Sequence, residues 1–170
     1  GSNSHCLLSC FDSNKKFLFI QKNGQVVFRA MLRLTKGSYA DDMHRKKIQF
    51  ADLSNLDETK EEEGEELVLF LERYYEKNLS CEELDAAVNL AIEAAKEKAN
   101  KLGACFVLST YYQDNVRTNE YIKSSYYLYI SKSKNGSQYL DSLFGSASVT
   151  DSGCYGKNLF LMENKSKRAA

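Results

Sequence analysis

Histidine and cysteine, the side chains that most often bind transition metals or act as nucleophiles, are few in this chain of 170 residues. There are two histidines and five cysteines, with no Cys-x-x-Cys pair and no His-Glu-x-x-His sequence. His5 is next to Cys6, but Cys6 and Cys10 fit a short buried strand at residues 6–11, so we expect no metal site. A nucleophilic pair such as Cys154 with His44 stays open, although no neighbouring residue marks Cys154 as activated.

The elements that must position any functional side chain are clearest in the middle of the chain. Residues 67–71 and 104–108 are continuous apolar runs, which is typical of buried strands. Between them, small and apolar residues from 86 to 102 recur every three or four positions, with Leu90 and Leu102 on the expected inner face of a helix. The glycine that follows can end this helix at positive φ. We predict a βαβ unit with two parallel, buried strands.

An antiparallel hairpin is predicted ahead of this unit. Residues 17–20 and 26–35 read as strands, and Asn23-Gly24 between them is a typical hairpin turn. Because side chains alternate along a strand, Arg29 and Arg33 should share one face of the second strand.

Further strands are predicted after the βαβ unit. A short helix should follow residue 108 and lead into a strand at 126–131. Residues 155–163 read as a final strand, which we expect to pair with the strand at 126–131. The predicted fold class is therefore α+β with a mixed sheet.

The segment from 67 to 130 resembles the C-terminal half of the GNAT acyltransferase fold. In that family a strand, a long helix, a strand and a short helix lead to a pattern like Tyr-x-Lys-x-Gly-Phe. Tyr121, Lys123, Ser125 and Tyr126 fall on the matching positions, with Ser in place of Gly and Tyr in place of Phe. The resemblance implies a single GNAT-like domain over residues 3–163: an N-terminal antiparallel hairpin, a βαβ unit, a short helix and C-terminal antiparallel strands.

The same resemblance implies an acyl-CoA-dependent N-acyltransferase. Glu72 or Tyr74, at the end of the first strand of the βαβ unit, would help to remove a proton from an amine substrate. Tyr121 would protonate the departing thiolate of CoA.

The family's cofactor turn, between that strand and the long helix, is glycine-rich and binds the pyrophosphate of acyl-CoA. The corresponding stretch here has no glycine, and the residues at the cofactor positions are Tyr75, Lys77, Asn78 and Ser80. Asn78 tolerates a left-handed conformation, and Ser80 with Glu83 forms a capping-box sequence. We favour a capped helix start over a phosphate cradle at this turn, and the cofactor site is degenerate by comparison with the family.

Composition limits the remaining classes of function. Twenty-three basic residues balance 23 acidic ones, so zero net charge disfavours nucleic acid as a partner. No apolar run approaches the roughly 20 residues of a membrane span, so we expect no membrane association. Five cysteines without disulfide spacing favour a reducing, cytoplasmic location. Residues 1–2 resemble an expression scar, residues 164–170 a frayed basic tail, and the whole a domain cut from a longer chain.

Two functions remain open. One is the acyltransferase, with an amine-bearing substrate or protein attracted by the acidic run at 58–66, although a plain solvated loop is the simpler interpretation of that run. The alternative is a non-catalytic protein-interaction module of a larger intracellular protein, using the loop at 145–153 and an aromatic surface. Eleven tyrosines, several in adjacent pairs, supply that surface, and alternation predicts one buried and one wetter ring in each pair.

Overall fold

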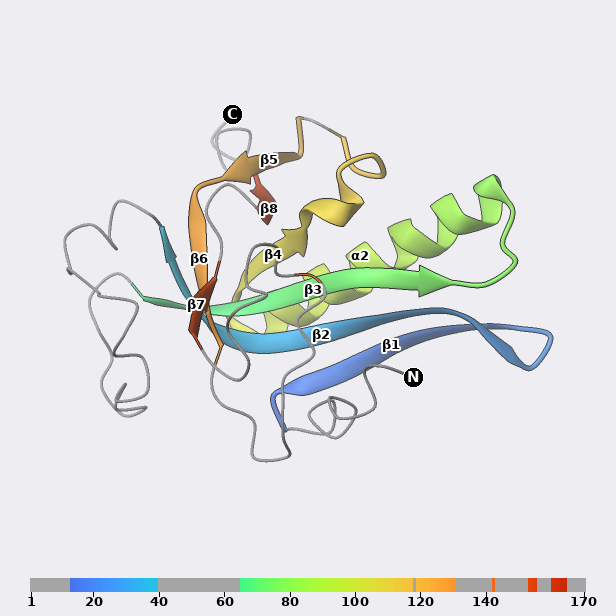
Figure 1. The fold of residues 1–170 in the computed structure, drawn as a ribbon, viewed down its shortest axis with the longest axis horizontal. Helices are drawn as coiled ribbons and strands as arrows, with labels where there is room; N and C mark the ends of the chain where they lie inside the picture. The colour runs from blue at the N-terminus through green and yellow to red at the C-terminus, as the bar shows by residue number, and fades with distance from the viewer. Residues whose placement is uncertain are drawn as a thin grey trace.

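The computed structural model describes residues 13–39, 65–117, 119–130, 142, 153–155 and 160–164. They form one mixed sheet with a long helix on one side (Figure 1). The strands are β1 (Lys15–Lys22), β2 (Gln25–Tyr39), β3 (Glu66–Glu76), β4 (Cys105–Ser109), β5 (Tyr121–Ser124), β6 (Tyr126–Ile130), β7 (Gly153–Tyr155) and β8 (Phe160–Glu163), and the helices are α2 (Cys81–Leu102) and the 3₁₀ turn η3 (Thr110–Tyr112).

The predicted N-terminal hairpin is confirmed. β1 and β2 pair antiparallel, and Asn23 and Gly24 at the turn have φ values of 52° and 77°. Positive φ at both central residues matches the right-handed twist of the strands, which is why Asn-Gly is favoured there. Arg29 and Arg33 both face away from α2, as their even spacing predicts.

The βαβ unit is also confirmed, because β3 and β4 pair in parallel with Val68 opposite Cys105 and Leu71 opposite Leu108. α2 connects them and begins at the predicted capping box. It ends at Gly103, which is left-handed at φ 65° and donates its N–H to carbonyls of the last turn.

The face that α2 buries differs from the predicted one. Leu90 is 61% exposed and Leu102 is 40% exposed, so the prediction that these two residues face the sheet is wrong. Val88 and Ile92 are buried instead, together with alanines at 87, 91, 95 and 99. The many alanines of α2 make two neighbouring stripes of the helix equally plausible as the buried face. The sheet packs against the stripe that also contains β-branched side chains.

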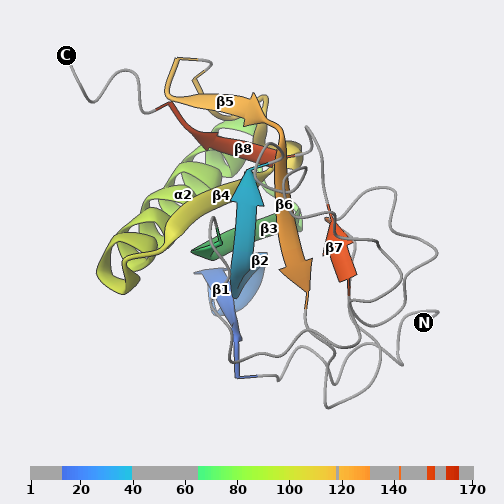
Figure 2. The same cartoon turned by 90° about the vertical axis from the view of Figure 1, so that its left-hand side faces the viewer.

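The sheet has the order β5-β8-β4-β3-β2-β6-β7, with β1 also paired to β2. β5 and β6 are separated by Ser125 alone, yet β5 pairs with β8 and β6 pairs with β2. A single residue cannot cross a flat sheet of this width, so the sheet curls and brings the two sides together. Figure 2 shows this curl, with β5 and β8 at the top and β6 running down beside β2.

Two predictions about the C-terminal half need correction. The short helix predicted after residue 108 is present as the three-residue 3₁₀ turn η3, but it leads first into β5, a strand that was not predicted and that contains Tyr121. The predicted final strand at 155–163 is not one strand: β7 pairs with β6, whereas β8 pairs with β4 and β5. Several strands are similarly apolar and could pair with these segments. Which of them do so depends on long-range packing, which the local sequence pattern does not indicate.

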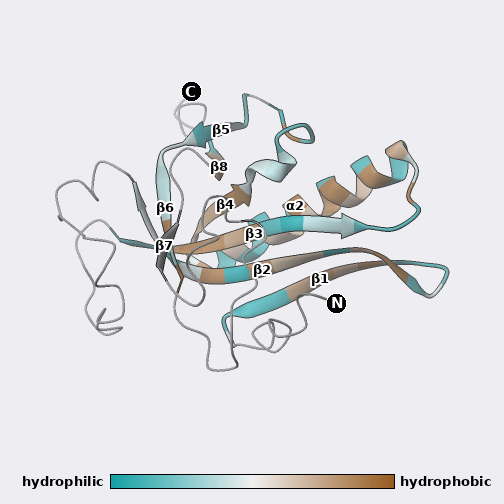
Figure 3. Ribbon diagram, viewed as in Figure 1, coloured by the Kyte–Doolittle hydropathy of each residue, from teal (hydrophilic) through white to brown (hydrophobic). Residues whose placement is uncertain are grey.

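Two buried clusters fill the two sides of the curled sheet. One lies between the sheet and α2 and includes Leu69, Leu71 and Phe106. The other lies inside the curl and includes Phe70, Leu128 and other residues of β3, β4, β6 and β8. Figure 3 shows that β3 changes from hydrophobic to hydrophilic along its length, so its carboxyl end leaves the core.

Candidate functional site

The predicted cofactor turn is a well-capped helix start. The Ser80 hydroxyl accepts from the Glu83 N–H at 3.1 Å, and the Glu83 carboxylate accepts from the Ser80 N–H at 3.2 Å. Asn78 is left-handed at φ 57°, and a Glu76 carboxylate oxygen accepts from the Leu79 N–H at 3.3 Å. The predicted capping box is confirmed. Carboxylates of the chain itself therefore occupy N–H groups that a pyrophosphate would need.

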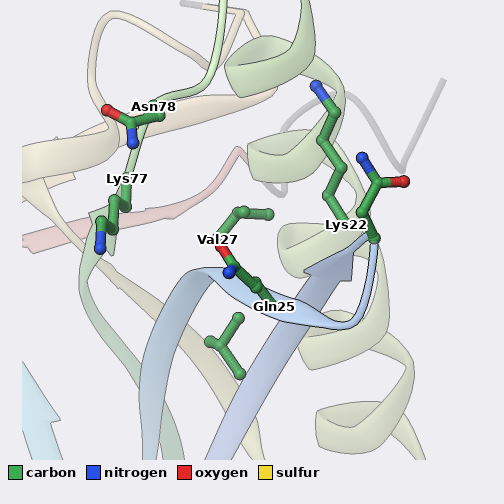
Figure 4. Close-up of a pocket in the computed structure, with 7 residues that line it drawn as sticks. Lys22, Gln25, Val27, Lys77 and Asn78 are labelled. Atoms are coloured by element: carbon green, nitrogen blue, oxygen red, sulfur yellow. The ribbon is translucent and has the colours of Figure 1, made fainter.

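A cavity of about 430 Å³ lies beside this turn. Figure 4 shows Lys77 and Asn78 on one wall, and Lys22, Gln25 and Val27 of the β1–β2 hairpin on the other. Two of the four predicted cofactor residues thus line one hollow. The Lys22 ammonium is already paired with the Glu83 carboxylate, and its hydrogen bond holds the pKa of Glu83 below the usual value.

Glu72, the first predicted catalytic residue, is buried in an ion pair. One carboxylate oxygen accepts from the Arg33 Nε at 2.9 Å, and the side chains of both residues are 3% exposed or less. Both residues face the inside of the curl, where Lys15 is also buried at the cross-strand position next to Arg33. A substrate amine has no direct access to a carboxylate in this position.

The three predicted catalytic residues are not together. Tyr121, on β5, is buried against the ring of Phe106 on β4. β5 lies three strands away from β3, a distance of about 14 Å across the sheet. β5 pairs with β8, β8 with β4, and β4 with β3. Followed across the sheet, these pairings place Tyr121 level with Leu69, well before the carboxyl end of β3. Tyr74 stacks on Phe28 at 5.2 Å between ring centroids, and burial raises the pKa of its hydroxyl, with Tyr111 the next cause.

A β-bulge shapes the carboxyl end of β3. Ala30 pairs with Tyr74 and Leu32 pairs with Leu71, so Glu72 and Arg73 both lie opposite the single residue Met31. The Arg73 N–H donates to the Ser142 hydroxyl at 2.8 Å. The buried Tyr112 hydroxyl donates to the Glu72 carbonyl at 2.6 Å, which ties η3 to the bulge. Both extra backbone groups of the bulge are thereby satisfied.

An arginine–tyrosine cluster lies just beyond the bulge. The Arg73 guanidinium lies 5.0 Å from the centroid of the Tyr75 ring and 4.6 Å from that of Tyr111. The Arg29 guanidinium lies 5.2 Å from the same Tyr75 ring. Tyr111 is 41% exposed, Arg29 is exposed, and Arg73 and Tyr75 are partly exposed. We call these four residues the Arg–Tyr cluster.

The cluster carries two cations for which the described residues provide no anionic partner. Within the described residues, neither Arg29 nor Arg73 forms an ion pair, and the buried Arg73 Nε–H has no acceptor. Stacking on tyrosine covers the faces of a guanidinium and leaves its N–H edges to bind planar acceptors such as carboxylates or phosphates. The carboxyl ends of β3 and β4 also form the position where sheets with parallel strands most often bind ligands.

Of this cluster, Tyr75 was predicted as a cofactor residue and Arg29 was predicted to share a face with Arg33. Tyr111 was expected only as a member of a tyrosine pair in an aromatic surface, and Arg73 was not predicted as a functional residue. The signals that point to them are an arginine next to a tyrosine pair at the end of a strand, and a second tyrosine pair after the parallel partner strand.

Several earlier candidates fall outside the described residues: the histidines, Cys6 and Cys10, the side chain of Cys154, most of the acidic run and most of the loop at 145–153. Across the part of the chain that is described, no three metal-ligating side chains converge. No helix in that part is long and apolar enough to span a bilayer. No known protein family, curated protein or solved structure matches this chain.

Proposed function

We propose that this domain is a non-catalytic interaction module of an intracellular protein, which binds an acidic partner through the Arg–Tyr cluster. The observation that carries the proposal is Arg73, held between the rings of Tyr75 and Tyr111 at the carboxyl end of β3 without an anionic partner among the described residues. Arginine and tyrosine, with tryptophan, are the residues enriched where protein interfaces concentrate their binding energy.

Three features favour binding over acyl transfer. The turn that would hold a pyrophosphate is closed by the side chains of Ser80 and Glu83. The carboxylate proposed as a base, Glu72, is buried against Arg33. The proposed acid, Tyr121, lies several strands from both other catalytic candidates.

An acyl-CoA-dependent N-acyltransferase is the second candidate, and one specific observation favours it. The cavity lined by Lys77 and Asn78 lies between the β1–β2 hairpin and the turn that joins β3 to α2, which is the turn that corresponds to the family's cofactor turn. Cofactor binding there would require the Glu83 carboxylate to release Lys22, which could then neutralise a phosphate.

Calorimetric titration with acetyl-CoA and with CoA separates the two candidates. For the interaction module we expect no heat from either ligand with the folded protein or with Tyr121→Phe. Micromolar binding of acetyl-CoA that Lys77→Ala weakens would favour the transferase and justify a screen of amine acceptors.

A second experiment tests the interaction directly. The domain, Arg73→Gln and Arg117→Gln are used to capture proteins from a lysate of the organism that encodes the chain, and the captured proteins are quantified by mass spectrometry. Arg117 is a suitable control because its side chain is 80% exposed and its guanidinium pairs with the nearby, exposed Glu120. A partner retained by the unmodified domain and by Arg117→Gln, but lost with Arg73→Gln, supports the proposal. Equal capture by all three proteins would contradict it.

A further inference from the structure

The Arg–Tyr cluster continues across the sheet as a surface stripe. In the pairing of β1 with β2, Phe19 lies opposite Arg29, and in the pairing of β2 with β3, Arg29 lies opposite Tyr75. Directly paired residues project from the same face of a sheet with Cβ atoms about 5 Å apart. Phe19, Arg29 and Tyr75 therefore form one row, and Arg73 extends it toward η3.

The β1 end of this stripe is apolar and exposed. Phe17 and Phe19 stack on each other at 5.6 Å between ring centroids, and they are 40% and 58% exposed. Phenylalanine has no polar group that would favour such exposure, and an exposed apolar patch bordered by polar residues is a feature of interaction sites.

We infer that the stripe binds an extended acidic peptide segment of a partner protein, in which an apolar residue is followed by carboxylates at alternate positions. The inference rests on the proposed function and names the chemistry of its partner. The two guanidinium carbons lie about 5 Å from the same ring centroid and are thus separated by no more than about 10 Å. Side chains on one face of an extended peptide repeat about every 6.6 Å. Alternate carboxylates can therefore reach Arg29 and Arg73, while a preceding apolar side chain contacts Phe19.

Single-stranded nucleic acid suits this surface less well. Such ligands need exposed ring faces for base stacking and a strongly cationic groove. The ring of Tyr75 is already covered by two guanidinium groups, and the chain has no net charge. Carboxylates instead match the available N–H edges, because a guanidinium and a carboxylate can form two parallel hydrogen bonds.

Fluorescence polarisation with the folded domain tests the inference. The probe is a fluorescein-labelled peptide with the core Phe-Thr-Glu-Thr-Glu, compared with Phe-Thr-Gln-Thr-Gln and with an oligothymidine. We expect saturable binding of the acidic peptide alone, weakened by added salt because the contacts are ionic. Arg29→Gln and Arg73→Gln should each weaken it about tenfold or more, since each removes a charged hydrogen-bonding group.

Matched variants separate the stripe from general effects of charge and hydrophobicity. Arg117→Gln removes an exposed arginine elsewhere, and Ile122→Ser removes an apolar residue of β5 that is 43% exposed. Both should bind the probe as the unmodified domain does, whereas Phe19→Ser should weaken binding. Circular dichroism of each variant confirms folding before the titration.

The opposite results are equally informative. Tighter binding of oligothymidine than of the acidic peptide, or equal binding of the glutamate and glutamine peptides, would overturn the inference. If the domain captures a partner through Arg73 but binds no acidic peptide, the inference fails and the proposed function stands. If Arg73 affects neither measurement, both fail.

Discussion

Removing the charge of Glu72 should destabilise the fold by about 3–5 kcal/mol, because it leaves a buried cation without its counter-ion. The Arg33 Nε and the Glu72 carboxylate are 2.9 Å apart, with both side chains almost completely buried. At an effective dielectric constant near 20, two unit charges about 4 Å apart attract by about 4 kcal/mol. Glu72→Gln keeps the shape of the side chain and one carbonyl acceptor, so the loss measures the charge rather than a cavity.

The assay is urea unfolding followed by circular dichroism, with the midpoint and the slope fitted separately. Glu120→Gln is the control, because Glu120 and Arg117 form an exposed pair at 3.9 Å and should contribute less than about 0.5 kcal/mol. The double variant Arg33→Met with Glu72→Met should be more stable than the sum of the single variants predicts, since neither member of this ion pair is left without the other. A loss below about 1 kcal/mol for Glu72→Gln would refute the reasoning. It would mean that water reaches the carboxylate, and Glu72 would again be available as a base.

Three further changes test other parts of the structure. Ser80→Ala should lower the free energy of unfolding by about 1 kcal/mol, because it removes the N-cap of α2, and Ser80→Asp should retain most of that stability. An unchanged urea midpoint for Ser80→Ala would contradict the capping geometry. Gly37→Ala should cost about 1–3 kcal/mol, because the new Cβ would lie 2.8 Å from the Tyr127 carbonyl oxygen; unfolding that matches the unmodified protein would mean that β6 pairs elsewhere. Burial is the main cause that raises the pKa of Tyr112 above its ordinary value of 10.0, and the hydroxyl of Tyr74 is the next cause. The neutral hydroxyl therefore contributes fully to the stability of the folded state below pH 10, and this contribution is lost as the pH rises further. Burial also raises the pKa of Tyr126. Ultraviolet titration should therefore show both tyrosines ionising only with unfolding, and Tyr112→Phe should reduce that step by one tyrosine; ionisation of Tyr112 near pH 10 in the folded protein would show that its ring is accessible.

Local signals in the sequence were sufficient to predict the β1–β2 hairpin and the βαβ unit formed by β3, α2 and β4. The hairpin follows from Asn23-Gly24, which allows positive φ at two successive residues. The βαβ unit follows from apolar runs on both sides of a helix with a capping box and a terminal glycine. Each of these signals acts within a few residues, so it can be recognised without knowledge of distant contacts.

The C-terminal half depends on contacts between distant segments. β5 and β6 are adjacent in sequence, yet they join opposite parts of the sheet, and the bend at Ser125 exists only because the sheet curls. The apolar residues of β8 are compatible with pairing to β6, β4 or β5, so their pattern alone did not identify the partners. The buried face of α2 was misassigned for a similar reason, because alanine fits against a sheet on either of two stripes.

The candidate site was less predictable than the fold, because it depends on the bulge. In a regular strand, Glu72 and Tyr74 would share the face that looks into the curl, and Tyr75 would face α2. The extra residue in β3 reverses this pattern from Tyr74 onward. Glu72 stays inside with Arg33, Tyr74 turns toward α2 and Phe28, and Tyr75 moves to the face that carries Arg29.

The bulge therefore links the buried ion pair to the proposed binding surface. Because of the extra residue, the carboxylate of Glu72 lies in the interior, whereas the guanidinium of Arg73, the next residue, lies near the surface. Arg33 neutralises the carboxylate of Glu72, so that group is not available to neutralise Arg73. The Arg73 side chain is instead held by two tyrosine rings, which orient it without cancelling its charge. The ion pair between Arg33 and Glu72 thus holds the strand in the interior, and the adjacent Arg73 remains as an oriented cation at the end of the strand. This arrangement favours a binding surface over a catalytic carboxylate.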